Sequence, residues 1–545
     1  MRYLITALLT FAFAAVVIAD TYPKNPNIDI IHYAFKLELT DRSDEIIGEA
    51  TVEVNFLVDE IREVRLDLTN ASKDLSGKGM TVDRVTAGGN AIEYRHENNV
   101  LLVKLTTPSK ANRREKFTVF YRGIPAAALK IANNRYNERT FFSDNWPDKG
   151  RNWLPTVDHP SDKATCEFIV TAPSHYQVVS NGLKIEETGL PNNTRITHWK
   201  QSVPIASWLY VLGAARFAVQ YVDEFDGKSI QTWVYHQDRD KGFYDFDDTT
   251  KKALEFYSDK NGPFSYEKLA NIQSNSVSGG MEAASAILYS ENSVVGDRNV
   301  RWRNVVIHEI AHQWFGNAVT EKDWDEVWLS EGFATYFTLL FIEHQYGRDE
   351  FLAGLRSSKT SVDAFYLKNP KYRLIHDNLQ NMNDVTTSQI YQKGSWTLHM
   401  LRGVVGTENF WKGIRAYYHK YRDSHATVAD FRREMEAASG KDLSDFFDQW
   451  LYKPGTLKLQ GQWRYDANSK EVTLSIDQVQ TGGSLYKMPL ELGVIYANQT
   501  RPKIEKINVT GKSNVFTFKA AEPPKELVLD PNIWVLMDAT LKEIK

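Results

Sequence analysis

Three things are scarce in this chain of 545 residues: cysteine, an excess of charge of one sign, and long apolar runs beyond the first twenty residues. Cys166 is the only cysteine, so an intramolecular disulfide is excluded and the fold must depend on hydrophobic cores. The formal net charge of -4 is small for this length and gives no support to nucleic acid or a charged membrane surface as a partner. We therefore expect the partner to bind at a discrete site.

The N-terminus holds the one long apolar run. MRYLITALLTFAFAAVVIAD carries an early cation at Arg2, an apolar stretch over residues 4–18, and a small residue at Ala19. This pattern predicts a signal peptide over residues 1–19, cleaved near Ala19, and an exported protein of the periplasm or the extracellular space with no stable membrane span after cleavage. The alternative is an uncleaved membrane anchor, because the run is only just shorter than a span.

Residues 20–217 alternate apolar and polar positions. HYAFKLELT (32–40) is one example, and turns rich in glycine and asparagine, such as TAGGNA (86–91), separate such runs. Alternation with period two places one set of side chains on each face of a strand. The sequence therefore predicts an N-terminal all-β domain.

The pattern then changes twice. Residues 218–453 carry apolar residues at helical spacing, as in TTKKALEFYSDKNG (249–262) and NVVIHEIAHQWFGNA (304–318), around a strand-rich patch near residue 280. Residues 454–545 return to short alternating runs, which predicts a C-terminal β-sandwich domain. The expected fold class is a multidomain α+β protein.

A candidate metal site lies in HEIAH, residues 308–312. His308 and His312 are four apart on a predicted helix, so their imidazoles stand one above the other and can bind one ion together. Glu309 lies about 100° round the helix, near enough to reach a water on that ion without ligating it. In a chain with thirteen histidines, chance yields about 0.02 copies of H-E-x-x-H, so the motif is a strong signal.

A catalytic zinc site usually takes a third protein ligand and leaves a fourth position for water. Glu331 is nineteen residues after His312, in the first turn of the next apolar helix, and the intervening loop is long enough to turn it back to the ion. The alternative for Glu331 is an acidic residue that only favours the helix dipole. The three residues at these spacings together favour the metal site.

These motifs resemble the M1 family of zinc aminopeptidases, gluzincins related to aminopeptidase N and leukotriene A4 hydrolase. H-E-x-x-H, eighteen residues and then Glu within WLSEGFA match the family signature, and HYAFKLELT, RNWLPTVDHPSDKATCEFIVTAP, IYQKGSWTLHML and FFDQWLYKPG extend the match over most of the chain. The resemblance implies a thermolysin-like α/β catalytic domain that binds one Zn²⁺ per chain and hydrolyses peptides with a free N-terminus.

The resemblance also implies roles for residues outside the metal motif. Tyr391, in IYQKG, matches the family tyrosine that donates a hydrogen bond to the oxyanion of the tetrahedral intermediate. Glu282, within SGGMEAASAI (278–287), matches the glutamate that binds the substrate's α-ammonium, while Gly279, Gly280 and Met281 belong to the backbone that pairs with the substrate as an edge strand would.

Two positions depart from the family pattern. Ala283 stands where the family motif G-x-M-E-N has asparagine, and the glutamine that usually assists amine binding is missing before RNWLP. Asp144 and Trp146 lie in that neighbourhood, and we expect Asp144 to supply a second carboxylate for the amine or Trp146 to wall the first subsite. These departures concern affinity and residue preference more than the chemistry.

Other functions stay open from the sequence. An endopeptidase or an epoxide hydrolase would use the same metal ligands, and a catalytically silent relative would be a binding scaffold. Residues after 455 read as strands rather than as the long helical domain of larger family members, so we expect no such domain and a more open active site.

Overall fold

The computed structural model describes residues 20–376, 379, 381–482, 484–497, 499 and 501–544. The predicted signal peptide, residues 1–19, lies outside the described residues. Among the described helices, none combines the length and the apolar character needed to cross a membrane.

The N-terminal part is built on an eight-stranded sheet. Strand β2 shows why: every second side chain along it is buried, which gives the sheet one core face. All neighbours pair antiparallel except β1 and β11, which run parallel. In sheet order the strands are β13 (Leu183–Leu190), β14 (Thr194–Ala206), β11 (Lys163–Pro173), β1 (Ile28–Glu38), β2 (Ile46–Phe56), β8 (Arg113–Ile124), β4 (Gly79–Ala87) and β5 (Asn90–Ile92).

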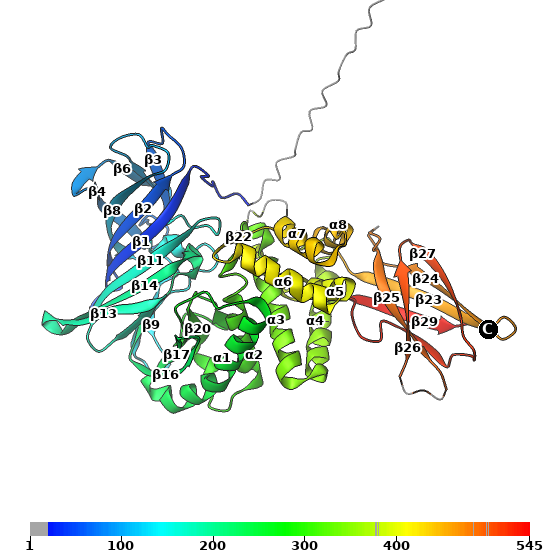
Figure 1. Cartoon of the computed structure of the whole chain (residues 1–545). Helices are drawn as coiled ribbons and strands as arrows, with labels where there is room; N and C mark the ends of the chain where they lie inside the picture. The colour runs from blue at the N-terminus through cyan, green and yellow to red at the C-terminus, as the bar shows by residue number, and fades with distance from the viewer. Residues whose placement is uncertain are drawn as a thin grey trace, which may run out of the picture.

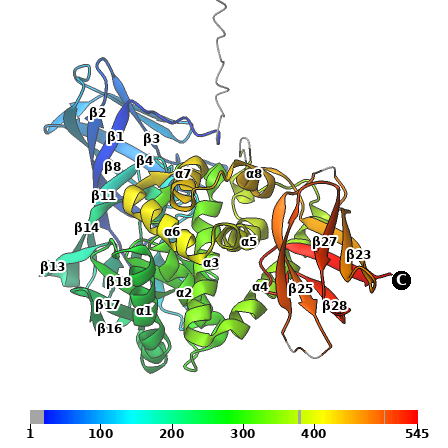
Figure 2. The ribbon, with the colours of Figure 1, turned by 45° about the vertical axis from the view of Figure 1, so that its right-hand side comes forward.

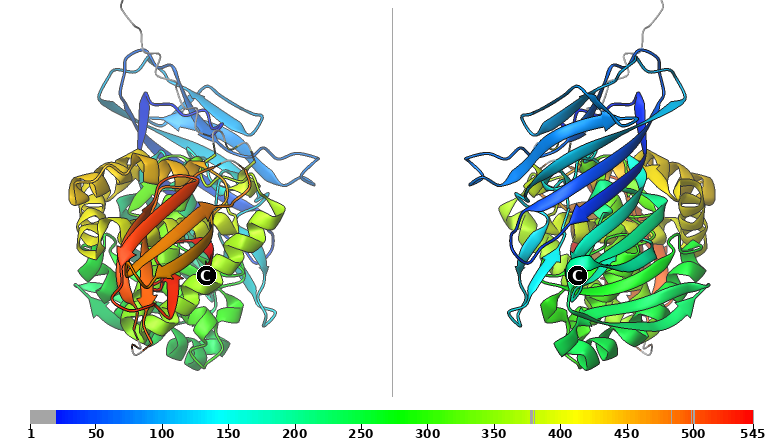
Figure 3. Two further views of the ribbon diagram at one scale, coloured as in Figure 1. Left: turned by 90° about the vertical axis from the view of Figure 1, so that its right-hand side faces the viewer. Right: turned by 90° about the vertical axis from the view of Figure 1, so that its left-hand side faces the viewer.

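Two smaller sheets complete this part, and the right-hand view of Figure 3 shows how its strands cover one side of the molecule. One sheet has the order β12 (Gln177–Ser180), β15 (Leu212–Ala215), β10 (Arg139–Phe142) and β9 (Lys130–Asn133), and the other β3 (Glu63–Asp67), β7 (Val100–Lys104) and β6 (Tyr94–Glu97). Strand β15 is the last strand of the N-terminal part, and the strand that follows it in the chain belongs to the sheet of the middle part.

The middle part combines a five-stranded sheet with helices. The sheet order is β16 (Phe217–Phe225), β17 (Lys228–Tyr235), β18 (Lys268–Ser274), β20 (Ala286–Ser290) and β19 (Gly280–Met281), which leaves the short strand β19 at an edge. A two-stranded parallel sheet joins β21 (Val319–Glu321) to β22 (Ser424–Ala426).

The helices of the middle part pack around α3, whose residues from Trp328 to Ile342 are almost all buried. Glycines with positive φ follow α1, α3, α5 and α7, and the one after α7, Gly440, has the left-handed conformation that closes a helix. The helices are α1 (Arg239–Asn261), α2 (Val300–His312), α3 (Trp328–Tyr346), α4 (Arg348–Lys368), α5 (Ser388–Val405), α6 (Thr407–Tyr421), α7 (Val428–Ser439) and α8 (Ser444–Phe447).

The C-terminal part consists of two sheets, which lie on the far side of the helices from the N-terminal strands in Figures 1 and 2. It packs on α5 through Trp534, whose ring stacks on His399 at 5.0 Å. One sheet has the order β27 (Ser513–Lys519), β24 (Glu471–Gln478), β23 (Leu457–Asp466) and β29 (Met537–Glu543). The other has the order β26 (Lys503–Val509), β25 (Met488–Ile495) and β28 (Glu526–Leu529).

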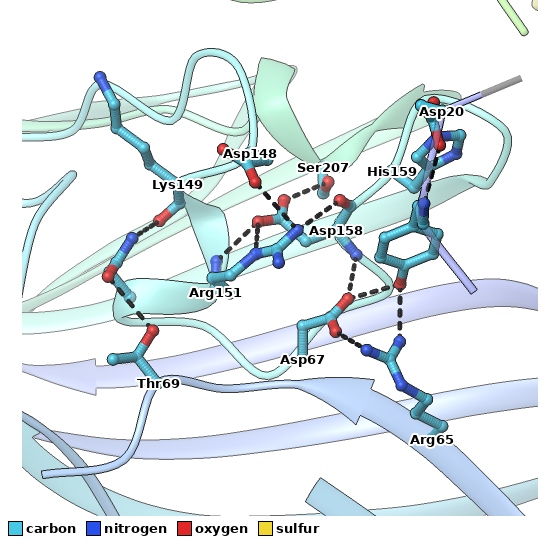
Figure 4. A network of polar contacts seen from close by, with 12 residues as sticks. Asp20, Arg65, Asp67, Thr69, Asp148, Lys149, Arg151, Asp158, His159 and Ser207 are labelled. Atoms are coloured by element: carbon cyan, nitrogen blue, oxygen red, sulfur yellow. Dashed lines mark hydrogen bonds and ion pairs between the residues drawn. The ribbon is translucent and has the colours of Figure 1, made fainter. Parts of the chain in front are cut away.

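The first described residues are held by a buried polar network (Figure 4). Asp20 Oδ2 is 2.8 Å from His159 Nε2 and accepts a hydrogen bond from the backbone N–H of Trp324 at 3.1 Å. Tyr22 stacks on His159 at 4.6 Å and donates its hydroxyl to Asp67. One short segment thereby ties the N-terminal sheets to the loop that precedes α3.

Candidate functional site

Helices α2 and α3 bring three metal-ligating side chains together. His308 and His312 come from the last turns of α2, and Glu331 from the first turn of α3. The two Nε2 atoms are 3.1 Å apart, and Glu331 Oε2 lies 3.3 Å from His308 Nε2 and 3.2 Å from His312 Nε2. Three donor atoms thus form a nearly equilateral triangle.

This triangle fits a zinc ion. Zinc ligands in a tetrahedral site lie about 2.0–2.1 Å from the metal, which places neighbouring donors about 3.3 Å from each other. His312 Nδ1 is 3.1 Å from the carbonyl oxygen of Phe315 and 3.1 Å from Ser330 Oγ. An Nδ1–H group that donates to that carbonyl leaves the Nε2 lone pair of His312 free for a metal.

The charges around the triangle favour a cation. Burial alone would raise the pKa of Glu331, but His312 and His308 outweigh it and hold that pKa below the ordinary range. Burial would likewise lower the pKa of His312, yet Glu282 and Glu331 raise it to about 10. His312 therefore retains a proton, and a divalent ion would compete with that proton for the imidazole lone pair.

Glu309 faces this centre from α2 and is 6% exposed. Burial raises its pKa well above the ordinary range, and the charge of Glu282 raises it further. Gly280 of β19 lies directly against its carboxylate, because a Cβ built on Gly280 would be 2.2 Å from Glu309 Oε1. A glycine at position 280 is thus required for Glu309 to lie where it does, a contact that the sequence analysis did not foresee.

Tyr391 on α5 closes another side of the triangle. Its hydroxyl donates to Glu331 Oε1 at 2.7 Å, and its ring stacks on His308 with 6.1 Å between ring centroids. Burial raises the pKa of Tyr391 well above the ordinary range, and Glu331 adds to the effect. The hydroxyl therefore stays protonated and available as a donor.

Glu282 follows the edge strand β19, and its carboxylate points to the same centre. Glu282 Oε1 is 4.0 Å from His312 Nε2, is buried, and has no hydrogen-bond partner among the described residues. Burial raises the pKa of Glu282 to about 7. Among the described strands, β19 pairs with β20 alone, so its other edge carries no strand where an extended peptide could pair.

The backbone after Glu282 is held by side chains that the sequence analysis missed. Gln313 Nε2 donates to the carbonyl of Glu282 at 3.0 Å, and Asn317 Nδ2 donates to the same oxygen. Both residues lie just beyond HEIAH, and this position next to the metal motif was the only sequence feature that could have indicated their role. Ala283 is 1% exposed, and its methyl group offers no hydrogen bond of its own.

Asp144 and Trp146 take different places. Asp144 lines a cavity of about 370 Å³ with Ser276, and burial raises its pKa. Its charge also contributes to the raised pKa of Glu282, so the two carboxylates are close, although no hydrogen bond joins them. Trp146 packs edge-on against Trp208 at 4.7 Å and Trp324 at 5.2 Å, within an aromatic cluster between the N-terminal and middle parts.

The family models give the same assignment as this geometry. The model of the peptidase M1 N-terminal domain matches residues 30–209, and the model of the peptidase family M1 domain matches residues 244–450. The chain belongs to peptidase family M1. Its metal triangle, Glu309 and Tyr391 all fall within the second of these M1 matches.

Curated relatives of this M1 peptidase are aminopeptidases. A "Probable aminopeptidase 2" of Sulfurisphaera tokodaii is 29% identical over 360 residues, which are 63% of this chain and 45% of that protein. Human glutamyl aminopeptidase is 25% identical over 456 residues, 78% of this chain and 47% of the relative. The chain thus spans about half the length of these relatives.

Solved structures share the fold. Aminopeptidase A of Legionella pneumophila, in complex with aspartic acid, superposes with a TM-score of 0.80 at 19% identity, over 96% of this chain and 61% of that one. An M1 zinc metallopeptidase from Deinococcus radiodurans has a TM-score of 0.67 at 22% identity, over 78% of this chain and 93% of that one.

Proposed function

We propose that this M1 peptidase is a zinc-dependent aminopeptidase that binds one Zn²⁺ and removes N-terminal residues from peptides. The observation that carries the proposal is the carboxylate of Glu282, which is buried, without a hydrogen-bond partner at Oε1, and beside the metal triangle. A buried carboxylate without a partner is costly unless a cation pairs with it. The α-ammonium of a peptide, protonated at neutral pH, is such a cation.

The metal would be held by His308, His312 and Glu331. Zinc in such a site supplies Lewis acidity, which lowers the pKa of water to about 7 and polarises a carbonyl group. Glu309, which faces the triangle from the helix that carries two of the ligands, would accept the proton of the attacking water and transfer it to the leaving nitrogen. Tyr391, a protonated donor, would stabilise the oxyanion.

Substrate orientation would come from the edge of β19. An extended peptide that pairs with Gly280 and Met281 places its first residue beside Glu282, and a longer N-terminal extension would meet that carboxylate. Glu282 therefore limits cleavage to the first peptide bond. Without that restriction, the same metal site would act as an endopeptidase.

The decisive experiment assays the zinc-loaded protein on free and N-acetylated aminoacyl amides, with Glu309→Gln as a second sample. We expect hydrolysis of the free amines only, and a loss of about 10²- to 10⁴-fold in the variant. Cleavage of acetylated peptides would favour an endopeptidase. Turnover of an epoxide without amide hydrolysis would favour an epoxide hydrolase, and the absence of turnover a silent binding protein.

We also propose that Asp144 assists in binding the amine or that Trp146 walls the first subsite. The carboxylate of Asp144 is near enough to Glu282 to influence its charge, whereas Trp146 is packed among other tryptophans. Michaelis constants of Asp144→Ala and Trp146→Ala distinguish the two roles. Unchanged constants in both variants would remove both.

Three further proposals concern the whole chain. The pattern of residues 1–19 supports export after cleavage near Ala19, to the periplasm or the extracellular space. The two C-terminal sheets support a β-sandwich domain over residues 454–545. Peptides with a free N-terminus are the expected partners. The balanced net charge gives no support to an interaction with nucleic acid.

A further inference from the structure

Three carbonyls of the turn from Glu282 to Ser285 accept hydrogen bonds from distant segments, and that of Ala283 accepts one from the N–H of Ala286. Gln313 and Asn317 bind the carbonyl of Glu282, and Asn181 Nδ2 donates to the carbonyl of Ala284 at 2.7 Å. Ser285 N–H donates to Gln313 Oε1 at 3.0 Å. The turn itself contributes little to this bonding, because Ala283 has no polar side chain.

Ser285 adopts a conformation that needs such support. Its φ is +63°, in the left-handed region that a serine seldom adopts without compensation. Its hydroxyl accepts a hydrogen bond from the N–H of Gly182 at 2.8 Å and lies 3.3 Å from Gln201 Oε1. Gly182 and Gln201 both belong to the N-terminal part of the chain.

Lys268, the first residue of β18, joins these groups. Its side chain is fully buried, and Nζ lies 2.9 Å from the carbonyl of Ser180, 3.3 Å from the carbonyl of Ser285 and 3.4 Å from Ser285 Oγ. Three acceptors thus surround the N–H groups of Nζ. No carboxylate of the described residues lies within ion-pair distance of Nζ, so its partners are the turn and the N-terminal part.

We propose that Lys268 is a positioning residue: it fixes the Glu282–Ser285 turn to the Ser180–Gly182 turn of the N-terminal part and thereby sets the affinity for the substrate's α-ammonium. The proposal rests on the role of Glu282 as amine anchor given above. The Ser285 carbonyl keeps a hydrogen bond from the N–H of Ala270 at 3.0 Å, and Ser285 Oγ keeps the one from Gly182. Loss of Lys268 removes the link between Ser285 and the carbonyl of Ser180, so the strained turn can shift and displace the Glu282 backbone. None of the three metal ligands contacts Lys268, so metal binding is expected to persist.

The test compares two zinc-binding inhibitors that differ in the amine. Leucine hydroxamate carries an α-amine, and 4-methylpentanohydroxamate has the same isobutyl group without the amine. For Lys268→Met, we expect the inhibition constant of leucine hydroxamate to rise about 10-fold and that of 4-methylpentanohydroxamate to change less than about 2-fold. With leucinamide as substrate, KM should rise about 10-fold while kcat stays within about 2-fold.

Lys228→Met is the matched control. Lys228 begins the neighbouring strand β17, donates to the backbone carbonyl of Phe264 and lies over the Phe264 ring at 5.3 Å, much as Lys268 lies over Trp199 at 4.9 Å. Both inhibition constants should stay at wild-type values in this variant. An equal rise of both constants in Lys268→Met, or no rise in either, would overturn the proposal.

Ser285→Gly provides a second route if Lys268→Met does not fold. Glycine accepts the positive φ but lacks the hydroxyl, so the backbone is not strained further. We expect the same selective rise for leucine hydroxamate, of about 3- to 10-fold. If the wild-type protein binds both hydroxamates equally, Glu282 is not an amine anchor and the proposed function fails. Failure of the Lys268 proposal is instead seen in the variants, so the two outcomes are distinguished.

Discussion

The metal triangle and the Glu282–Ser285 turn lie side by side but are built in different ways. The triangle uses two helices, and two of its three ligands are one turn apart on α2. The turn from Glu282 to Ser285 is held by side chains from β18, from the residues after α2, and from the N-terminal part. In the proposed function, catalysis would thus depend on local helix geometry, and amine recognition would depend on contacts between distant segments.

This difference teaches where the site is robust. Changes within α2 or α3 should alter metal binding and turnover together, whereas changes in the distant supports should alter substrate binding first. The four variants below each test one contact of the triangle or of the segments around the turn, and they are arranged from the largest expected effect to the smallest.

Tyr391→Phe removes the hydroxyl beside the metal triangle but keeps the ring that stacks on His308. We expect kcat to fall about 10²- to 10³-fold with zinc retained, because a donor to the oxyanion is lost. Steady-state kinetics with metal analysis checks this. Undiminished activity would show that Tyr391 has no part in the reaction.

Gly280→Ala places a methyl group where the Glu309 carboxylate lies. We expect kcat to fall about 10²-fold, since a displacement of about 1 Å in a catalytic group costs that much. Gly189→Ala, in β13 of the N-terminal part, is the control, because a Cβ there would meet no atom within 4 Å. Equal activities of the two variants would contradict the contact between Gly280 and Glu309.

Ser330→Ala removes a hydroxyl 3.1 Å from His312 Nδ1 but leaves the Phe315 carbonyl in place. We expect zinc affinity to fall about 10-fold, at the low end for groups that orient a metal-binding histidine. Chelator competition measures it. Ser395→Ala is the control, because that buried hydroxyl has no hydrogen-bond partner among the described residues. An equal loss of zinc affinity in both variants would argue against a role of Ser330 in orienting His312.

Lys268→Met should also change the pH dependence of stability. Burial lowers the pKa of Lys268 from 10.5 to about 7, so between these values the unfolded chain binds a proton that the folded chain has lost. The free energy of unfolding of the wild type should therefore rise with pH from about 7 toward 10, by at most about 1.4 kcal/mol per pH unit more than that of the variant. Denaturant unfolding at several pH values measures this difference. Plots of the free energy of unfolding against pH that run parallel for the wild type and the variant would show that Lys268 does not change its protonation in this range.

The sequence was sufficient for features that depend on local periodicity. The four-residue spacing of His308 and His312 predicts their shared face, and α2 over Val300–His312 places them on it. Alternation in residues 32–40 likewise predicts a strand where β1 lies. The nearness of Glu331 followed from the motif and from the length of the loop.

Other features depend on contacts that no spacing reveals. Helix α1 begins at Arg239, whereas the apolar pattern starts near residue 249, because its first turns are fixed by packing: Gly242 lies against Val234, and a Cβ there would be 2.5 Å from Val234 Cγ1. Lys268 lies in a strand where every residue is buried, so neither alternation nor polarity marks its role. The contact of Gly280 with Glu309 joins positions 29 residues apart.

The aromatic cluster between the N-terminal and middle parts provides an optical reporter. Trp146 and Trp208 come from the N-terminal part, Trp324 comes from the loop before α3, and the three ring centroids lie 4.7 to 6.2 Å from one another. Indoles this close couple their electronic transitions and give a circular-dichroism couplet that isolated tryptophans lack. The intensity of that couplet measures how closely the two parts are docked, in the absence of substrate and independently of turnover.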